Sequence, residues 1–308
     1  SRMFCATPYL SKKKQWHSFY IRESYDDSNN LRIERKLAIK IFNDFQKFIL
    51  AHLSQKEKDL FAVFNTFGDD FFFSDCDRAS REKSTFINYL ARNKNIITIP
   101  TDFGNLDFEF TTRQSYDVST NTLMGYEDEL NRIIIFVNDI NSISILELMT
   151  ILRQRDYFIH ELTHYIDNVT NGKLNRVNTN NRAEYLDDED EQKAFLQAMI
   201  ASFGAWLFKN QKDLQNYDFF NKKDVLNLFE NKFLKGKLQK VIDAKSLELF
   251  NDFYNYISDT VRNKIKIQIL NCIVKEHSDS SFTESKKRQN LIRLLRLSYT
   301  TLLDDINN

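Results

Sequence analysis

The sequence predicts an α+β protein that is predominantly helical, with a small mixed sheet near its middle and a helical assembly towards its C-terminal end. Apolar residues recur at helical spacing over much of the chain, and only two prolines and six glycines occur among its 308 residues, which favours long helices. Runs with strand character interrupt this pattern between residues 95 and 137. We therefore expect a helical region at 1–94, a mixed core at 95–210 and a second helical region at 211–308.

The first region is expected to begin with a long amphipathic helix. Polar residues that can cap a helix lie at 26–30, and apolar residues then recur at Ile33, Leu37, Ile41, Phe45 and Phe48. Such a stripe predicts one helix face packed on a core. A second helical pattern covers residues 60–67.

Three runs in the middle of the chain are expected to be strands. Residues 96–99 are apolar and bounded by Asn95 and Pro100, and Phe108 and Phe110 alternate with acidic residues. Residues 132–137 have the strongest strand pattern in the chain. Between these runs, the segment 120–125 has the composition of a turn.

Helical periodicity returns after the last of these strands. Asn141 or Ser142 is expected to cap a helix at 145–151. A second helix, or a continuation of the first, extends to about residue 168, and Gly172 is its expected stop.

The remainder of the chain is also expected to be helical after one polar loop. This loop is the Asn-rich segment 173–182, and acidic residues at 187–190 mark the start of a helix that continues to Trp206. Further helical patterns cover residues 225–233, 238–256, 261–274 and 286–303.

One of the expected helices carries the sequence His160-Glu161-Leu162-Thr163-His164. Positions i and i+4 of an α-helix lie one turn apart on the same face, so the two imidazoles can bind one metal ion. Zinc prefers neutral imidazole nitrogen at ~2.0–2.1 Å in a tetrahedral shell, and a catalytic site leaves one position for water. Glu161 follows the first ligand directly, where its carboxylate can take a proton from that water. The spacing is the HExxH motif.

The histidine content argues against a chance occurrence of this motif. Only five histidines occur among the 308 residues, and random placement gives the pattern in well under ~1% of such chains. The alternative is a purely structural histidine pair. Two imidazoles and a carboxylate turned towards an apolar core then need other partners to offset desolvation.

Charge and cysteine usage exclude several classes of protein. Lys+Arg and Asp+Glu each number 43, whereas a general nucleic-acid binder carries an excess of Lys and Arg. Cys5, Cys76 and Cys272 form no CxxC pattern, which indicates neither a disulfide framework nor a cysteine zinc site. The first residues lack the apolar run of a signal peptide, and no stretch approaches ~18 apolar residues. We expect synthesis in a reducing cytoplasm and no nucleic-acid or membrane partner, while the oligomeric state is left open.

Residues 160–164 read HELTH, and on this motif the chain resembles the zincin metallopeptidases and, among them, the gluzincins. The likeness covers about residues 132–199 and implies a zincin-like catalytic core at 95–210, with His160 and His164 as zinc ligands and Glu161 as general base. A short sheet before the motif helix lets an exposed sheet edge accept an extended peptide substrate. A phage peptidase, or a bacterial effector protease delivered into a host cell, would fit the chain length. The alternative is an interaction or virion-structural protein that retains a zincin domain with a structural metal site.

The gluzincin resemblance also implies a glutamate ligand on a later helix, which we assign to Glu191. Glu191 comes 27 positions after His164, beyond the Asn-rich loop, in the first turns of the expected helix. The small residues Ala194, Ala198 and Ala201 follow on the same face and allow another helix to approach closely. The Asn-Glu ligand block of the thermolysin family is absent here. The alternative third ligands are Asp167, Glu184, Asp188 and Glu189. Asp167 is otherwise a hydrogen-bond partner for a ligating histidine.

Overall fold

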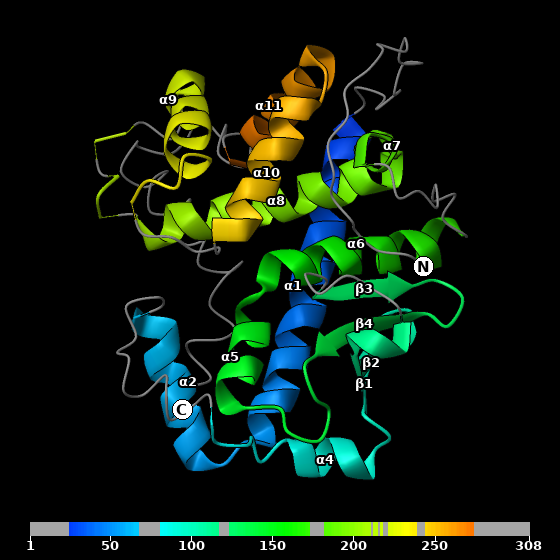
Figure 1. Cartoon of the computed structure of the whole chain (residues 1–308). Coiled ribbons are helices and arrows are strands. Elements are labelled where there is room, and N and C mark those ends of the chain that lie inside the picture. The colour runs from blue at the N-terminus through cyan, green and yellow to red at the C-terminus, as the bar shows by residue number, and fades with distance from the viewer. Residues whose placement is uncertain are drawn as a thin grey trace. The chain divides into compact units, whose positions relative to one another are not determined.

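The structure is a computed structural model (Figure 1) that describes residues 25–67, 81–116, 123–172, 182–210, 212–214, 216–217, 221–238 and 244–273. Contacts divide the chain into two compact units. Among the described residues, the first unit comprises those between 40 and 182, and the second comprises 25–39 together with those from 183 onwards. The three-region division expected at residues 94 and 210 stays a prediction.

The first unit contains a small mixed sheet, as the sequence predicts, and the sheet has four described strands where three were expected. The strands are β1 (Ile96–Thr101), β2 (Gly104–Thr112), β3 (Met124–Glu127) and β4 (Arg132–Val137), in the order β1-β2-β4-β3. β1 pairs antiparallel with β2, β2 pairs parallel with β4, and β3 pairs antiparallel with β4. β4 is therefore an inner strand, and β3 lies at the edge of the sheet next to it.

β3 corrects one expectation from the sequence. Met124 and Gly125 were expected to end a turn, but they pair with Ile135 and Ile134 of β4. The backbone ladder with the strongly strand-forming β4 outweighs the weak local preference of a four-residue segment that contains glycine. Residues 120–122 of the expected turn lie outside the described part of the chain.

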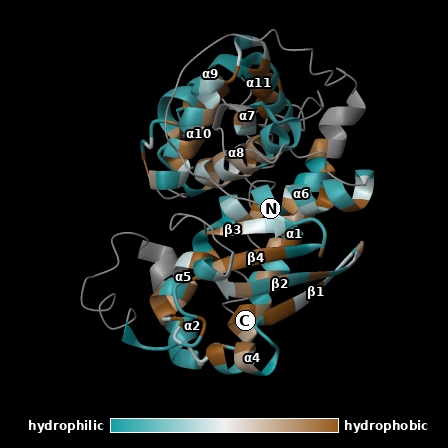
Figure 2. Ribbon diagram, turned by 45° about the vertical axis from the view of Figure 1, so that its right-hand side comes forward, coloured by the Kyte–Doolittle hydropathy of each residue, from teal (hydrophilic) through white to brown (hydrophobic). Residues whose placement is uncertain are grey.

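An aromatic core joins the sheet of the first unit to its helices. Phe45 of α1 (Tyr25–Ala51) stacks on Phe108 of β2 with ring centroids 4.4 Å apart, and it lies 5.0 Å from the ring of Phe158 in α6 (Arg155–Asn171). All three rings are almost fully buried, so they contribute a large apolar area to the core. α6 packs against β3 and β4. Figure 2 shows the apolar stretches along β1 and β4.

The described part of the first unit also contains the shorter helices α2 (Gln55–Phe67), α4 (Ile87–Arg92) and α5 (Ile145–Arg153) and the 3-10 turn η2 (Arg113–Tyr116). α5 is capped by Ser144, whose hydroxyl accepts the N–H of Glu147, instead of by the expected Asn141 or Ser142. α5 and α6 are separate helices joined at Gln154, whose backbone is not helical. Gly172 follows α6 with φ of +88°, a conformation that glycine adopts without steric cost, and the expected stop is confirmed.

Hydrogen bonds to the carboxylate of Glu57 fix the start of α2. The N–H and hydroxyl of Ser54 donate to Glu57 Oε2 at 2.8 and 2.7 Å, and the N–H of Thr85 donates to Glu57 Oε1 at 2.8 Å. Burial by itself would raise the pKa of Glu57, but the hydrogen bonds from Thr85 and Ser54 outweigh burial and lower that pKa. The carboxylate thus links α2 to the segment before α4.

The second unit is helical in all its described elements. It holds the first part of α1 together with α7 (Arg182–Asp187), α8 (Glu189–Lys209), α9 (Lys222–Leu228), the π-helical turn η3 (Phe229–Phe233), α10 (Ala244–Tyr256) and α11 (Asp259–Ile273). The expected helix at 286–303 lies outside the described residues. Among the helices that are described, none is both long and apolar enough to cross a lipid bilayer.

α8 is the central helix of the second unit and is buried along most of its length. α10 and α11 pack against it, and Phe195 of α8 stacks on Phe253 of α10 with ring centroids 4.7 Å apart. α8 also bonds to the first part of α1. Gln197 of α8 accepts a hydrogen bond from Arg35 at 3.0 Å and donates one to the carbonyl of Leu31 at 2.8 Å. These bonds satisfy a glutamine that is fully buried.

Candidate metal centre

The two histidines of the motif lie on one face of α6, as their spacing predicts. Their Nε2 atoms are 3.2 Å apart. Two ligands of one tetrahedral zinc ion, each at ~2.0–2.1 Å, are separated by ~3.3–3.4 Å. The two rings therefore present the same nitrogen at almost the separation that a shared zinc ion requires, before any third group is considered.

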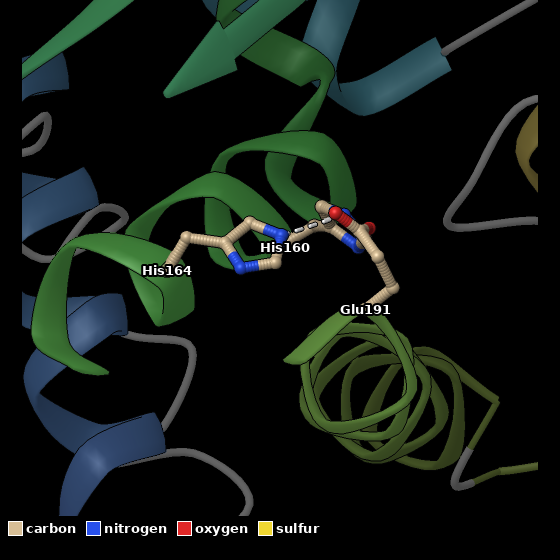
Figure 3. Close-up of side chains that lie close together, drawn as sticks. All are labelled: His160, His164 and Glu191. Carbon is tan, nitrogen blue, oxygen red and sulfur yellow. Dashed lines mark hydrogen bonds between the residues drawn. The ribbon is translucent and has the colours of Figure 1, made fainter. Parts of the chain in front are cut away.

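Glu191 joins this pair from the first turn of α8. One carboxylate oxygen of Glu191 and one ring nitrogen from each of His160 and His164 all lie within 4.8 Å of one another. Figure 3 shows the three side chains side by side. Two imidazoles and a carboxylate are a usual ligand set for zinc. The group could hold a metal ion, and the identity of that metal stays a prediction.

All three candidate ligands are buried. His164 is 1% exposed, Glu191 is 6% exposed and His160 is 9% exposed. A carboxylate and two imidazoles so far from solvent lose most of their hydration, and a bound cation is one way in which proteins compensate for that loss.

Two other candidate ligands, Asp188 and Glu189, lie at the start of α8 near Glu191. Asp188 is the N-cap of α8, and its carboxylate accepts the N–H groups of Asp190 and Glu191. The acidic residues at 187–190 were expected to mark the start of this helix, and Asp188 is the one that caps it. Glu189 is exposed. The side chain of Glu184 lies outside the described part of the chain.

Asp167 is buried on α6, with 3% of its surface exposed. Its Oδ1 accepts a hydrogen bond from Nδ2 of Asn171 at 3.3 Å. Asp167 does not belong to the group formed by His160, His164 and Glu191. Its expected role as a partner of a ligating histidine stays a prediction.

Glu161, the expected general base, is held by the backbone of the sheet. Its Oε2 accepts the N–H of Tyr126 in β3 at 2.8 Å. The bond joins two residues that are 35 positions apart in sequence. Glu161 follows His160 directly on α6, so this bond ties the residue beside the first histidine to β3. Its catalytic role stays a prediction.

The pairing of β3 explains why the N–H of Tyr126 is available to Glu161. In an antiparallel ladder, successive residues alternately bond to the partner strand and point away from it. The carbonyl of Leu123 accepts the N–H of Phe136 at 2.9 Å, so Gly125 and Glu127 also bond to β4. The backbone groups of Met124 and Tyr126 therefore point away from β4, and the N–H of Tyr126 reaches Glu161.

The side chain of Tyr126 forms a second link between β3 and α6 that the sequence did not reveal. Its hydroxyl donates to Oδ1 of Asn131 at 2.7 Å and accepts from Nδ2 of Asn168 at 2.6 Å. Asn131 has φ of +52° in the turn between β3 and β4, a conformation in which asparagine is enriched. Local patterns carried no signal for this three-residue network, because its members come from a strand, a turn and a helix.

Comparisons of the chain with known protein families, with curated proteins and with solved structures found no significant match. The chemistry of the centre is therefore argued from the arrangement of its own residues.

Proposed function

We propose that this protein is a zinc-dependent metallopeptidase with a zincin-like core, which hydrolyses peptide bonds by means of activated water and Glu161 as general base. The observation that carries the proposal is the group of His160, His164 and Glu191, with Glu161 next to its first histidine in the sequence. A purely structural zinc site is usually closed by four protein ligands. Three protein ligands would leave one position of a tetrahedral shell for water.

The proposed mechanism gives the three ligands and Glu161 separate roles. His160, His164 and Glu191 would hold the metal, and a zinc ion there would supply an activated water by lowering its pKa from ~15.7 towards ~7. Glu161 would take the proton of this water as it attacks the peptide carbonyl, and would pass the proton to the amine that leaves when the C–N bond breaks. The N–H of Tyr126 orients the carboxylate of Glu161 by bonding to its Oε2.

A peptide is the substrate class that suits the edge of the sheet. β3 is an edge strand of the described sheet. An extended chain can add to a sheet edge as a further strand through main-chain hydrogen bonds.

Metal content and proteolysis together test this proposal. We expect about one zinc ion per chain after preparation in zinc, and cleavage of an unfolded protein such as reduced casein. The Glu161→Gln variant should keep the zinc but lose the cleavage, because an amide cannot accept the proton. Bound zinc with no difference in cleavage between wild type and variant would overturn the proposed peptidase and favour a structural metal site.

A further inference from the structure

We propose that Tyr126 is a positioning residue that sets the location of the Glu161 carboxylate through its main-chain N–H, while its own hydroxyl holds that N–H in place. This inference rests on the proposed function and deepens it, because it assigns a role to a residue outside the HExxH motif. It also predicts that a side chain without a catalytic group affects turnover.

β3, whose backbone bonds to Glu161, is a short edge strand. β3 has four residues, and among the described strands it pairs with β4 alone. An edge strand with hydrogen bonds on one side opens locally more readily than an inner strand. A base that depends on the backbone of such a strand needs a further restraint to stay in position.

The side chain of Tyr126 supplies this restraint. Tyr126 pairs with Ile133 on the sheet, and its side chain is almost fully buried. Its hydroxyl bonds to Asn168 of α6 and to Asn131 of the turn. Asn168 lies seven positions after Glu161, which is two turns along the same face of α6. One residue of β3 thus bonds to the motif helix at two points of one face.

The two bonds from Tyr126 hold β3 at a fixed distance from α6. Loss of the hydroxyl bond to Asn168 releases one of the two points and lets β3 move relative to Glu161. A displacement of ~1 Å can reduce a catalytic rate by up to ~100-fold, even when the altered residue does not take part in the chemistry. We expect a smaller loss here, because the bond from the N–H to Glu161 can still form.

Tyr126→Phe is the test variant, and Tyr165→Phe is its matched control. Tyr165 lies on α6, is almost fully buried, and its ring packs edge-on against that of Tyr126 with centroids 6.2 Å apart. Its hydroxyl bonds instead to Thr101 at 2.7 Å. Both variants therefore remove one hydroxyl from the same aromatic pair, but only Tyr126→Phe breaks the link to Asn168.

Two readouts decide the inference in the zinc-loaded protein. The first is amide hydrogen exchange followed by NMR: we expect the amide of residue 126 to exchange at least ~10-fold faster in Tyr126→Phe, while that of Gly125 is unchanged because it bonds to β4. The second is peptide hydrolysis: we expect kcat to fall by ~10-fold with KM within ~2-fold. Tyr165→Phe should change neither readout by more than ~2-fold, and both variants should keep their zinc.

A double-mutant cycle tests whether the two side chains act together. Asn168→Ala should also lower kcat, and the Tyr126→Phe/Asn168→Ala double variant should be no worse than Tyr126→Phe alone, because Tyr126→Phe already removes the bond to Asn168.

The outcomes separate this inference from the proposed function. Unchanged exchange at residue 126 in Tyr126→Phe, or an equal loss of kcat in Tyr165→Phe, would overturn the positioning role while the peptidase stands. Lack of any hydrolysis by the zinc-loaded wild type would overturn the proposed function and, with it, the inference.

Discussion

Replacement of Glu191 by alanine should weaken zinc binding severely without unfolding the protein. The carboxylate is 6% exposed and lies within 4.8 Å of the ligand atoms of both histidines. Loss of a partner that only hydrogen-bonds to a ligand typically costs ~10–100-fold in metal affinity. Loss of a direct ligand should cost at least ~100-fold, which corresponds to ~2.7 kcal/mol or more.

This loss translates into a measurable change in thermal stability. At a free zinc concentration of ~100 times the wild-type Kd, binding stabilises the folded protein by ~2.7 kcal/mol. A Kd that is ~100-fold weaker reduces the gain to ~0.4 kcal/mol at the same zinc concentration. For the 308 residues of this chain, an unfolding entropy of ~2.1 cal/mol/K per residue turns the difference of ~2.3 kcal/mol into a shift of ~3–4 °C in Tm.

The assay is thermal unfolding at fixed free zinc and again with a chelator, supported by direct titration of zinc. Glu189→Ala is the matched control, since it makes the same change in the same turn of α8 at an exposed position. We expect the control to keep the full zinc-dependent gain. If Glu191→Ala binds zinc like the wild type while Glu184→Ala or Glu189→Ala does not, the assignment of the third ligand is wrong.

Three further predictions concern the motif and the start of α2. His160→Ala should lower the bound zinc from about one to below ~0.2 equivalents per chain by metal analysis, and unchanged content would show that the metal binds elsewhere. Glu161→Gln should reduce peptide hydrolysis by ~10² or more with zinc retained, since a general base contributes ~10²–10⁴, and an unaltered rate would assign the base to another residue. Glu57→Gln should lower the stability by ~1 kcal/mol at pH 7 in denaturant unfolding, because it weakens a capping box. The folded-state pKa of Glu57 is lowered, so this stabilisation is present above the unfolded pKa of ~4.3 and disappears as the pH falls through the folded value. A stability difference that is the same at pH 3 and pH 7 would contradict this account.

Several features of this protein follow from local sequence alone. The i, i+4 spacing of His160 and His164 brought their Nε2 atoms to 3.2 Å, because helix geometry is the same wherever the helix lies. The stop at Gly172 and the strand at Arg132–Val137 were predictable for the same reason. Each depends on residues within a few positions of one another.

Tertiary structure decided the features that depend on distant residues. Local composition did not reveal that β3 is a strand, because four residues with a glycine become one only by pairing with β4. It also gave no sign of the bond from Tyr126 to Glu161 or of the bond from Asn168 to Tyr126. These contacts join residues 35 and 42 positions apart, and such pairs depend on how strands and helices pack.

The proposed metal centre combines both kinds of information. The sequence by itself determined the histidine pair and placed Glu161 beside it, since three residues of one helix turn need no tertiary contact to be neighbours. It left five carboxylates open for the third position. In the fold Asp188 caps α8, Glu189 is exposed, and Glu191 lies with the histidines, so the assignment to Glu191 stays a prediction that the described residues support. The position of a carboxylate on a second helix depends on packing, and helical periodicity cannot encode it.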